Sequence, residues 1–333
     1  MTERFITDNY DGYEVKYPFL IEHVKTQLEK QFWTATEAKV ELDEIELRHV
    51  LTPEQQHVVK RLLPLFLKYE LYVGSFWTDV YCKLFPTPEA VDAGVTVAMV
   101  ERAIHARFYD KINAAFGLNN DDFYLSYLND PAYAERVKWI GEVLSSEDKV
   151  KTCCAFGLIE ASALFSAFAL LRSFQANGYN LISVVVRGTK QSALDEKLHS
   201  KILADTLNVM FKEKGSSIDS TEYISWLLEM AHKMYLNEEH IIDSLIGDEF
   251  NKVSKEDYKK FVRCCINDYF VRIGSEIKPF PDDHYSELYE WFDMQNEAYS
   301  DPDFFTKGQN KEYEIACNED AFGGVWLNFK EGE

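Results

Sequence analysis

The segment "LDEKLHS" at residues 194–200 places an acid, Glu196, and a histidine, His199, three positions apart within a long stretch of helical periodicity. Residues three or four positions apart on a helix project from the same side, so both side chains can reach one point. A single pair of this kind is usually a solvated surface feature. Its meaning therefore depends on what the other helices carry.

Most of the chain has apolar residues at helical spacing, and only 15 glycines and 9 prolines occur among its 333 residues. The helices that this periodicity predicts span 20–33, 53–84, 88–116, 148–177, 180–214, 220–246, 254–273 and 282–299. Strand signals are weak, although "LISVVV" would suit a strand in isolation. We therefore expect an all-α fold, with a helical bundle over residues 1–300 and a flexible C-terminal tail over residues 301–333.

Composition limits the partners and the compartment. The chain has 56 acidic against 35 basic residues, which argues against a nucleic-acid partner. Six cysteines show neither a disulfide framework nor a zinc spacing, which indicates free thiols in a reducing cytoplasm, or a host cytoplasm for a viral protein. The N-terminal segment lacks a signal-peptide core, and we expect no run of about 18 apolar residues that spans a membrane.

Four of the predicted helices each carry an acid within an apolar stripe, and two of them add a histidine on the same side. In chain order these residues are Glu70, Glu101 with His105, Glu160, and Glu196 with His199. Burying four carboxylates without compensation is implausible, because the desolvation of each isolated charge costs on the order of several kcal/mol or more. A pair of divalent metal ions would turn this cost into binding energy.

The donor types indicate which metals would suit such a site. Carboxylate oxygens and imidazoles without thiolates favour iron or manganese over zinc. One Glu from each of two helices, with a Glu/His pair from each of the other two, is the ligand set of carboxylate-bridged dinuclear bundles. The set predicts a dinuclear centre (Fe/Fe, Mn/Fe or Mn/Mn) with two metal ions per chain. Alternatively, Glu160 is a core acid that pairs with Arg172 or Arg187.

Along most of its length the chain resembles the small, radical-generating subunit of class I ribonucleotide reductase, in the ferritin-like superfamily. The matching segments, in order and spacing, are "KQFWTATE", "LTPEQQHVVKRLLPLFLKYE", "ERAIHARFYDKIN", "LIEASALFSAFALLRSF", "RGTKQSALDEKLHS" and "INDYFVRIGSEIKPFP". The resemblance implies a ferritin-like bundle, normally a homodimer, whose metal pair reacts with oxygen or another oxidant. The oxidising equivalent, often a tyrosyl radical, passes to the large subunit for reduction of ribonucleotides to deoxyribonucleotides.

By position, the resemblance implies the metal ligands Glu70, Glu101, His105, Glu160, Glu196 and His199. It also implies that Asp195 links the ligand His105 to Trp33. An outer carboxylate of this kind fixes the tautomer of the imidazole and offers a coupled route for a proton and an electron.

The chain departs from the family pattern at two ligand positions. The first acid is commonly Asp but is Glu70 here, and Glu101 precedes His105 by four residues rather than three. A π-bulge absorbs one extra residue, and with it both side chains ligate and Tyr109 is the radical tyrosine. In the alternative, the radical position counted from Glu101 falls on Phe108, and the metal pair itself stores the oxidising equivalent.

The C-terminal segment resembles the family's flexible tail, which binds the large subunit and carries a relay tyrosine. Tyr313 in "NKEYEIA" is the candidate, and "FGGVWLNF" supplies aromatic anchors. Two rival functions remain open. Another ferritin-like di-metal oxidase would act on a small apolar substrate, whereas a non-enzymatic helical protein would pair its buried acids with Lys or Arg and bind no metal.

Overall fold

The structure is a computed structural model that describes residues 4–10, 12, 14–283 and 285–297. Its α-helices are α1 (Pro18–Lys25), α2 (Pro53–Phe76), α3 (Cys82–Leu84), α4 (Pro88–Met99), α5 (Ala106–Phe116), α6 (Asp121–Tyr124), α7 (Pro131–Leu144), α8 (Lys149–Ser162), α9 (Phe165–Arg172), α10 (Ser183–Glu213), α11 (Tyr223–Leu245), α12 (Lys255–Arg272) and α13 (Glu287–Glu297). The tail over residues 301–333, with Tyr313, lies outside the described residues.

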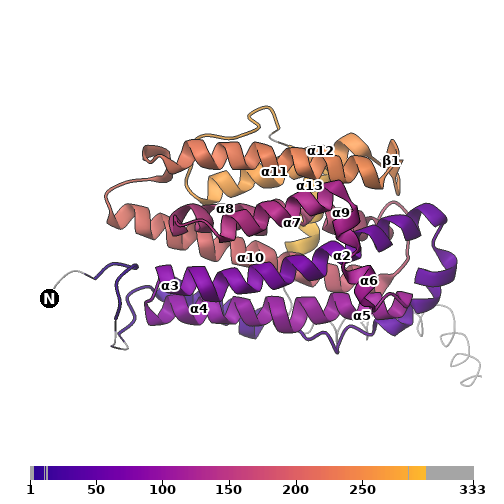
Figure 1. Cartoon of the computed structure of the whole chain (residues 1–333), viewed down its shortest axis with the longest axis horizontal. Helices are drawn as coiled ribbons and strands as arrows, with labels where there is room; N and C mark the ends of the chain where they lie inside the picture. Colours follow the sequence, from indigo (N-terminus) through magenta and orange to yellow (C-terminus); the bar gives the residue numbers. More distant parts are fainter. Residues whose placement is uncertain (1–3, 11, 13, 284, 298–333) are drawn as a thin grey trace, which may run out of the picture.

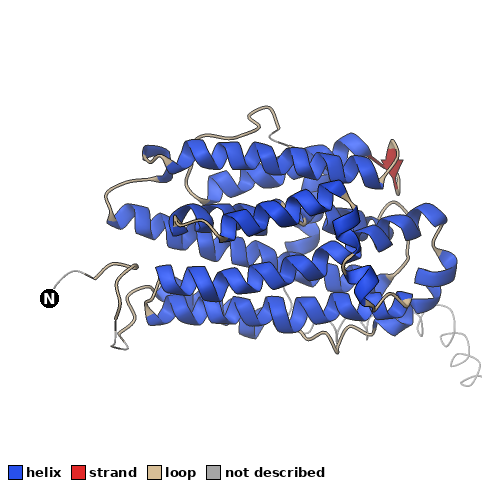
Figure 2. Ribbon diagram, in the orientation of Figure 1, coloured by secondary structure: helices blue, strands red, loops and turns tan. Residues whose placement is uncertain are grey.

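Short helical segments of other kinds join these helices. The π-helical segments are η1 (Thr26–Lys30), η3 (Glu46–Val50), η4 (Trp77–Tyr81) and η5 (Val100–His105). The 3₁₀ segments are η2 (Val40–Asp43), η6 (Ser126–Asn129), η7 (Ser173–Gln175) and η8 (Ile218–Ser220). The strands of the described residues are β1 (Glu249–Phe250) and β2 (Val253–Ser254), which pair antiparallel. Figure 2 shows how completely helices dominate the described part of the chain, which confirms the predicted all-α fold.

The long helices run side by side (Figure 1). Helix α2 continues into η4, and α4 continues through η5 into α5, so that these two rods form one side of the bundle. Helices α8 and α10 pack closely along each other beside them, and α11 and α12 cover α8 from the other side. The four central rods therefore carry the four acidic positions that the sequence singled out.

Helix ends explain several of these boundaries. Helix α2 begins with a reciprocal capping box between Thr52 and Gln55, and Asp148 caps α8 by accepting hydrogen bonds from two backbone amides. The first turn of α10 is held by Asp43, whose carboxylate accepts from the backbone amide of Val185 at 2.8 Å. The segment "LISVVV" is thus mostly the start of a buried helix, although its composition would also suit a strand.

Two expectations about helices need correction. Helix α7 is absent from the predicted set, although Asp130 caps it and Pro131 opens its first turn. The single helix expected over 148–177 is instead broken after Ser162 into α8, α9 and η7. The run Lys149–Gln175 is also long and apolar enough to cross a membrane, contrary to expectation, but the apolar window is entirely buried within the bundle. It is the core segment of this fold.

Candidate metal centre

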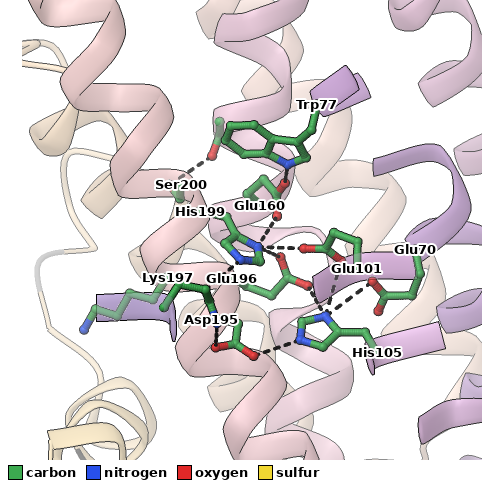
Figure 3. A network of polar contacts seen from close by, with 12 residues as sticks. Glu70, Trp77, Glu101, His105, Glu160, Asp195, Glu196, Lys197, His199 and Ser200 are labelled. Atoms are coloured by element: carbon green, nitrogen blue, oxygen red, sulfur yellow. Dashed lines mark hydrogen bonds and ion pairs between the residues drawn. The ribbon is translucent and has the colours of Figure 1, made fainter. Parts of the chain in front are cut away.

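Six buried side chains from the four central rods converge in the middle of the bundle (Figure 3). They are Glu70 from α2, Glu101 and His105 from η5, Glu160 from α8, and Glu196 and His199 from α10. Each has a relative exposure of 1% or less. The structure therefore brings together the six residues that the sequence selected, and their role as ligands remains a prediction.

The six side chains form two groups that share two carboxylates. Glu101 places Oε2 3.3 Å from His105 Nδ1 and Oε1 2.6 Å from His199 Nδ1. Glu196 likewise places Oε1 3.5 Å from His105 Nδ1 and Oε2 3.6 Å from His199 Nδ1. Each of these two carboxylates thus offers one oxygen to each group. Such an arrangement would let Glu101 and Glu196 contribute to the binding of two neighbouring cations.

The other two acids each belong to one group. Glu70 Oε2 lies 3.5 Å from His105 Nδ1, and Glu160 Oε2 lies 3.8 Å from His199 Nδ1. Within each group the candidate ligand atoms all lie within 4.8 Å of one another. Each group therefore presents three carboxylates and one imidazole, which are hard oxygen and nitrogen donors of the kind that iron and manganese accept.

The chain leaves the inward atoms of this cluster without hydrogen-bond partners. The unpartnered atoms are both carboxylate oxygens of Glu70, Glu101 and Glu196, Oε2 of Glu160, and Nδ1 of His105 and His199. Within the described residues, the ion pairs of these four acids are all with the two histidines. Buried polar atoms are normally satisfied, so this cluster fits cations that bind between its members.

Arg172 is not the counter-charge that one interpretation assigned to Glu160. Its guanidinium donates to the backbone carbonyls of Phe292 and Lys190, each at 3.3 Å, and it lies over the ring of Phe292. Glu160 instead accepts a hydrogen bond from the indole of Trp77. The buried acid is therefore oriented by a neutral donor and faces the other carboxylates.

The electrostatics of the cluster follow from burial and crowding. Burial raises the pKa of Glu70 and Glu160, and the adjacent carboxylates of Glu101 and Glu196 raise it further. For His105, burial opposes protonation, but the surrounding carboxylates outweigh it and raise the pKa of the imidazole. In the metal-free protein, protons must therefore offset part of the negative charge, and metal ions would displace them.

The predicted π-helical turn is present between Glu101 and His105. The backbone amide of Ala106 donates to the carbonyl of Glu101, five residues earlier, and this widened turn is η5. Glu101 and His105 both face the cluster, and the widened turn absorbs the one residue by which their spacing exceeds the three of the family pattern. The local structure therefore supports the bulged interpretation of "ERAIHARFY".

Asp195 connects one group to Trp33, as the resemblance implied. Its Oδ2 accepts from Trp33 Nε1 at 2.8 Å and lies 3.0 Å from His105 Nε2. A residue that sequence reasoning missed extends this network, because Gln27 donates to Asp195 Oδ1 at 2.9 Å and places Oε1 3.2 Å from His199 Nε2. With both Nε2 atoms engaged, both Nδ1 atoms face the cluster.

Trp77 is the second residue that was missed. Its indole Nε1 donates to Glu160 Oε1 at 2.9 Å, and its side chain is fully buried. The signal was in the sequence, since Trp77 follows Glu70 by seven residues, which is about two helical turns and so the same face. Gln27 offered no such signal because it comes from the π-helical segment η1, outside the four ligand rods.

Tyr109 and Phe108 point to different neighbours. Tyr109 is fully buried and stacks on Phe66 with ring centroids 4.3 Å apart, and its hydroxyl has no hydrogen-bond partner. Burial, and then the carboxylate of Glu70, raise the pKa of the Tyr109 phenol. Phe108 instead contacts Trp33 with centroids 5.4 Å apart. Tyr109 therefore lies on the side of the first acid, in a fully buried position.

Comparisons with known proteins agree with this architecture. The R2 subunit of ribonucleotide reductase from Clostridium botulinum has a TM-score of 0.75 at 17% identity, and the match covers 84% of this chain and 89% of that one. Dimanganese(II)-NrdF from Streptococcus sanguinis has a TM-score of 0.72 at 20% identity and coverages of 86% and 99%. An R2-like ligand-binding oxidase variant with a reconstituted Mn/Fe cofactor has a TM-score of 0.63 at 15% identity and coverages of 79% and 98%.

These identities are low enough that the solved structures establish the fold alone. No sequence of a curated protein matches the chain. The family model "Ribonucleotide reductase, small chain" matches residues 10–286, which include all four rods and every residue of the buried cluster. This match extends over most of the chain, and the protein therefore belongs to the family of ribonucleotide reductase small chains.

Proposed function

We propose that the buried cluster holds the metal pair of a class I ribonucleotide reductase small subunit, through Glu70, Glu101, His105, Glu160, Glu196 and His199. The observation that carries this proposal is the sharing of Glu101 and Glu196 between two groups whose inward atoms lack other partners. When bound, such a metal pair supplies a one-electron oxidising equivalent after reaction with oxygen or another oxidant. As a small subunit, the chain works with a large subunit that reduces ribonucleotides to deoxyribonucleotides.

The ligand atoms are compatible with an Fe/Fe, an Mn/Fe or an Mn/Mn pair. Two structurally similar proteins carry dimanganese(II) and Mn/Fe, respectively. Oxygen and imidazole donors accept either element, and Glu70 adds one methylene of reach where the family commonly has Asp. Metal loading therefore has to be tested with both metals, separately and together.

In this proposal, Trp33 and Asp195 form the route by which the oxidising equivalent leaves the metal site toward the large subunit. Asp195 accepts hydrogen bonds on one oxygen from the indole of Trp33 and from His105 Nε2, so it holds the imidazole with Nδ1 toward the cluster. When the indole of Trp33 loses an electron, its Nε1 proton has an acceptor at 2.8 Å. The network thus couples movement of a proton to movement of an electron.

Tyr109 is the proposed radical residue. Its ring is sealed between Phe66 and the remaining core, and no water-accessible surface reaches it. A phenoxyl radical at this position would be protected from solvent and from reductants. Trp33 and Asp195 distinguish this proposal from an oxidase of small apolar substrates, which has no use for a route that carries the oxidising equivalent to another subunit.

The finer statements about partners are also proposals. A homodimer would cover the outer face of α2, α4 and η5, where Leu71, Val95 and Met99 are exposed and Leu71 lines a groove of about 610 Å³. Docking on the large subunit is assigned to residues 301–333 with Tyr313 as the relay tyrosine. Deletion of residues 305–333 is expected to abolish complex formation without unfolding the bundle, and unchanged affinity would contradict the assignment. The described cysteines are free thiols, in agreement with a cytoplasmic location.

The first experiment combines metal analysis with low-temperature electron paramagnetic resonance on protein exposed to oxygen. We expect about two metal ions per chain and an organic radical signal that Tyr109→Phe removes. Two metal ions without an organic radical would keep the site and place the oxidising equivalent on the metals. No metal under any loading condition would contradict the proposed site.

A further inference from the structure

We propose that Trp77 is a positioning residue of the metal centre: it holds Glu160 so that only one carboxylate oxygen faces a metal ion. This inference rests on the proposed metal site. It assigns a role to a side chain from the same rod as Glu70, one that acts on the opposite group of ligands.

The two oxygens of Glu160 have different surroundings. Oε1 accepts the indole N–H of Trp77 at 2.9 Å, whereas Oε2 has no hydrogen-bond partner and lies 3.8 Å from His199 Nδ1. Figure 3 shows the indole above Glu160, with the other carboxylates on the far side. The carboxylate is therefore divided between an outward oxygen that is already bonded and an inward oxygen that is free to bind a cation.

Among the four acids of the cluster, only Glu160 has this constraint. Glu70, Glu101 and Glu196 have no hydrogen-bond partner on either oxygen. Glu70, the other acid that belongs to one group only, can therefore present both oxygens to the same cation. Glu70 and Glu160 therefore differ in how many carboxylate oxygens are free to bind a cation, and this difference originates at Trp77.

Packing fixes the indole independently of any metal ion. Its ring lies 4.7 Å from that of Tyr81, and the hydroxyl of Tyr81 is in turn 3.0 Å from Thr206 Oγ1. The indole also meets the ring of His199 edge-on, with centroids 6.2 Å apart. The π-helical segment η4 begins at Trp77, so the widened turn starts where the indole leaves the helix. A donor held this firmly can orient its acceptor before a metal ion arrives.

The test is a titration of metal-free protein with Mn²⁺ for wild type and Trp77→Phe. Phenylalanine keeps a ring in the pocket and removes only the N–H donor and part of the ring area. Loss of an outer partner of a metal ligand typically weakens binding about 10- to 100-fold, and we expect this for one of the two binding steps. The paramagnetic resonance spectrum of the loaded protein should also change, because Glu160 can then offer both oxygens.

Two controls separate this role from simple packing. Trp139 is also buried, but its indole N–H points to Met230 Sδ at 3.4 Å, so Trp139→Phe should leave Mn²⁺ affinity unchanged. In a Glu160→Ala background, which removes the acceptor of the indole N–H, Trp77→Phe should have no further effect on the remaining affinity, because the residue acts through that carboxylate. Circular dichroism confirms that each variant is folded.

The outcomes also separate this inference from the proposal beneath it. If wild type binds two Mn²⁺ ions and Trp77→Phe binds them with the same affinities, the positioning role is wrong and the site stands. Equal weakening by Trp77→Phe and Trp139→Phe would likewise overturn the positioning role in favour of packing. If wild type binds no metal ion at all, the proposed metal site fails first.

Discussion

Buried glutamates occur in two regions of this bundle, and the two regions differ in the groups that compensate the carboxylate charge. Glu238 in α11 forms an ion pair with Arg136 from α7 and accepts a hydrogen bond from the hydroxyl of Ser166. Arg136 also donates to the carbonyl of Ala163 at 2.6 Å, in the break between α8 and α9. In the central cluster, four glutamates face one another and two histidines, without a lysine or arginine among their ion pairs within the described residues.

This difference distinguishes a structural acid from a functional one. Both regions are fully buried, so each carboxylate has lost the hydration that stabilises its charge. At Glu238 the chain itself supplies a counter-charge through Arg136, although burial still raises the pKa of this carboxyl, and the pair also anchors the helix break. At the central cluster the chain supplies too little compensation, and the remainder must come from protons or metal ions. The comparison therefore predicts opposite responses to mutation and to metal removal.

The largest contrast is in metal content. Glu101→Ala removes an oxygen from both groups, so we expect metal content to fall from about two ions per chain to nearly none. Glu238→Gln should retain both ions, although it leaves Arg136 without its ionic partner. Elemental analysis after desalting measures the number of metal ions per chain in both variants. Loss of metal in both variants would mean that the two regions are not independent.

The next contrast is in stability. Arg136→Met leaves Glu238 buried without a counter-charge, and breaking a buried pair in this way costs about 3–5 kcal/mol of unfolding free energy. Metal-free and metal-loaded protein should lose about the same amount, as measured by urea denaturation. Replacing both partners, in Arg136→Met with Glu238→Leu, should restore much of the loss. A single-variant loss below about 1 kcal/mol would show that solvent already reaches the pair.

In the central cluster the sign should reverse. Glu70→Leu removes one of the crowded carboxylates, and we expect metal-free protein to become more stable by about 1–3 kcal/mol. The same variant should gain less than wild type from added Mn²⁺, because it has lost a ligand. Thermal unfolding with and without metal measures both effects. Destabilisation of the metal-free variant would indicate that Glu70 has a structural partner.

The same comparison explains what the sequence could and could not predict. The six central residues were predictable because each acid interrupts an apolar helical stripe, and such an interruption can be recognised in the sequence alone. The pairing of Glu238 was not predictable, because its partner Arg136 lies on a helix that the periodicity missed and 102 residues away in the chain. The helix break, the ion pair and the contact with Ser166 all depend on tertiary structure, and no local sequence pattern specifies them.

The outer contacts of the cluster divide in the same way. The π-helical turn η5 was predictable through the family resemblance, since the spacing of Glu101 and His105 is one residue longer than the family pattern and this residue had to be absorbed somewhere. Gln27 was not, because its approach to Asp195 and His199 depends on how the N-terminal segment packs across α10. Trp33, which belongs to the same segment, was likewise identified through the family resemblance.

The smallest predicted effect extends the comparison to neutral groups, at two buried tyrosines. The hydroxyl of Tyr81 lies 3.0 Å from Thr206 Oγ1, whose own proton goes to the carbonyl of Ile202 at 2.7 Å, so Tyr81 is the donor. The hydroxyl of Tyr109 has no partner of normal hydrogen-bond geometry. Tyr81→Phe should therefore cost about 1 kcal/mol, whereas Tyr109→Phe should change the unfolding free energy by less than about 0.5 kcal/mol.

The functional result should be the reverse of the structural one. Tyr109→Phe should keep the stack on Phe66 and its metal content, yet lose the organic radical signal, whereas Tyr81→Phe should keep that signal. Urea denaturation and paramagnetic resonance on the same samples test both halves. A cost at Tyr109 equal to that at Tyr81 would show that its hydroxyl is bonded in solution, with Ser192 as the candidate partner. A radical that survives Tyr109→Phe would assign the oxidising equivalent to another residue, because phenylalanine in this position cannot form a phenoxyl radical.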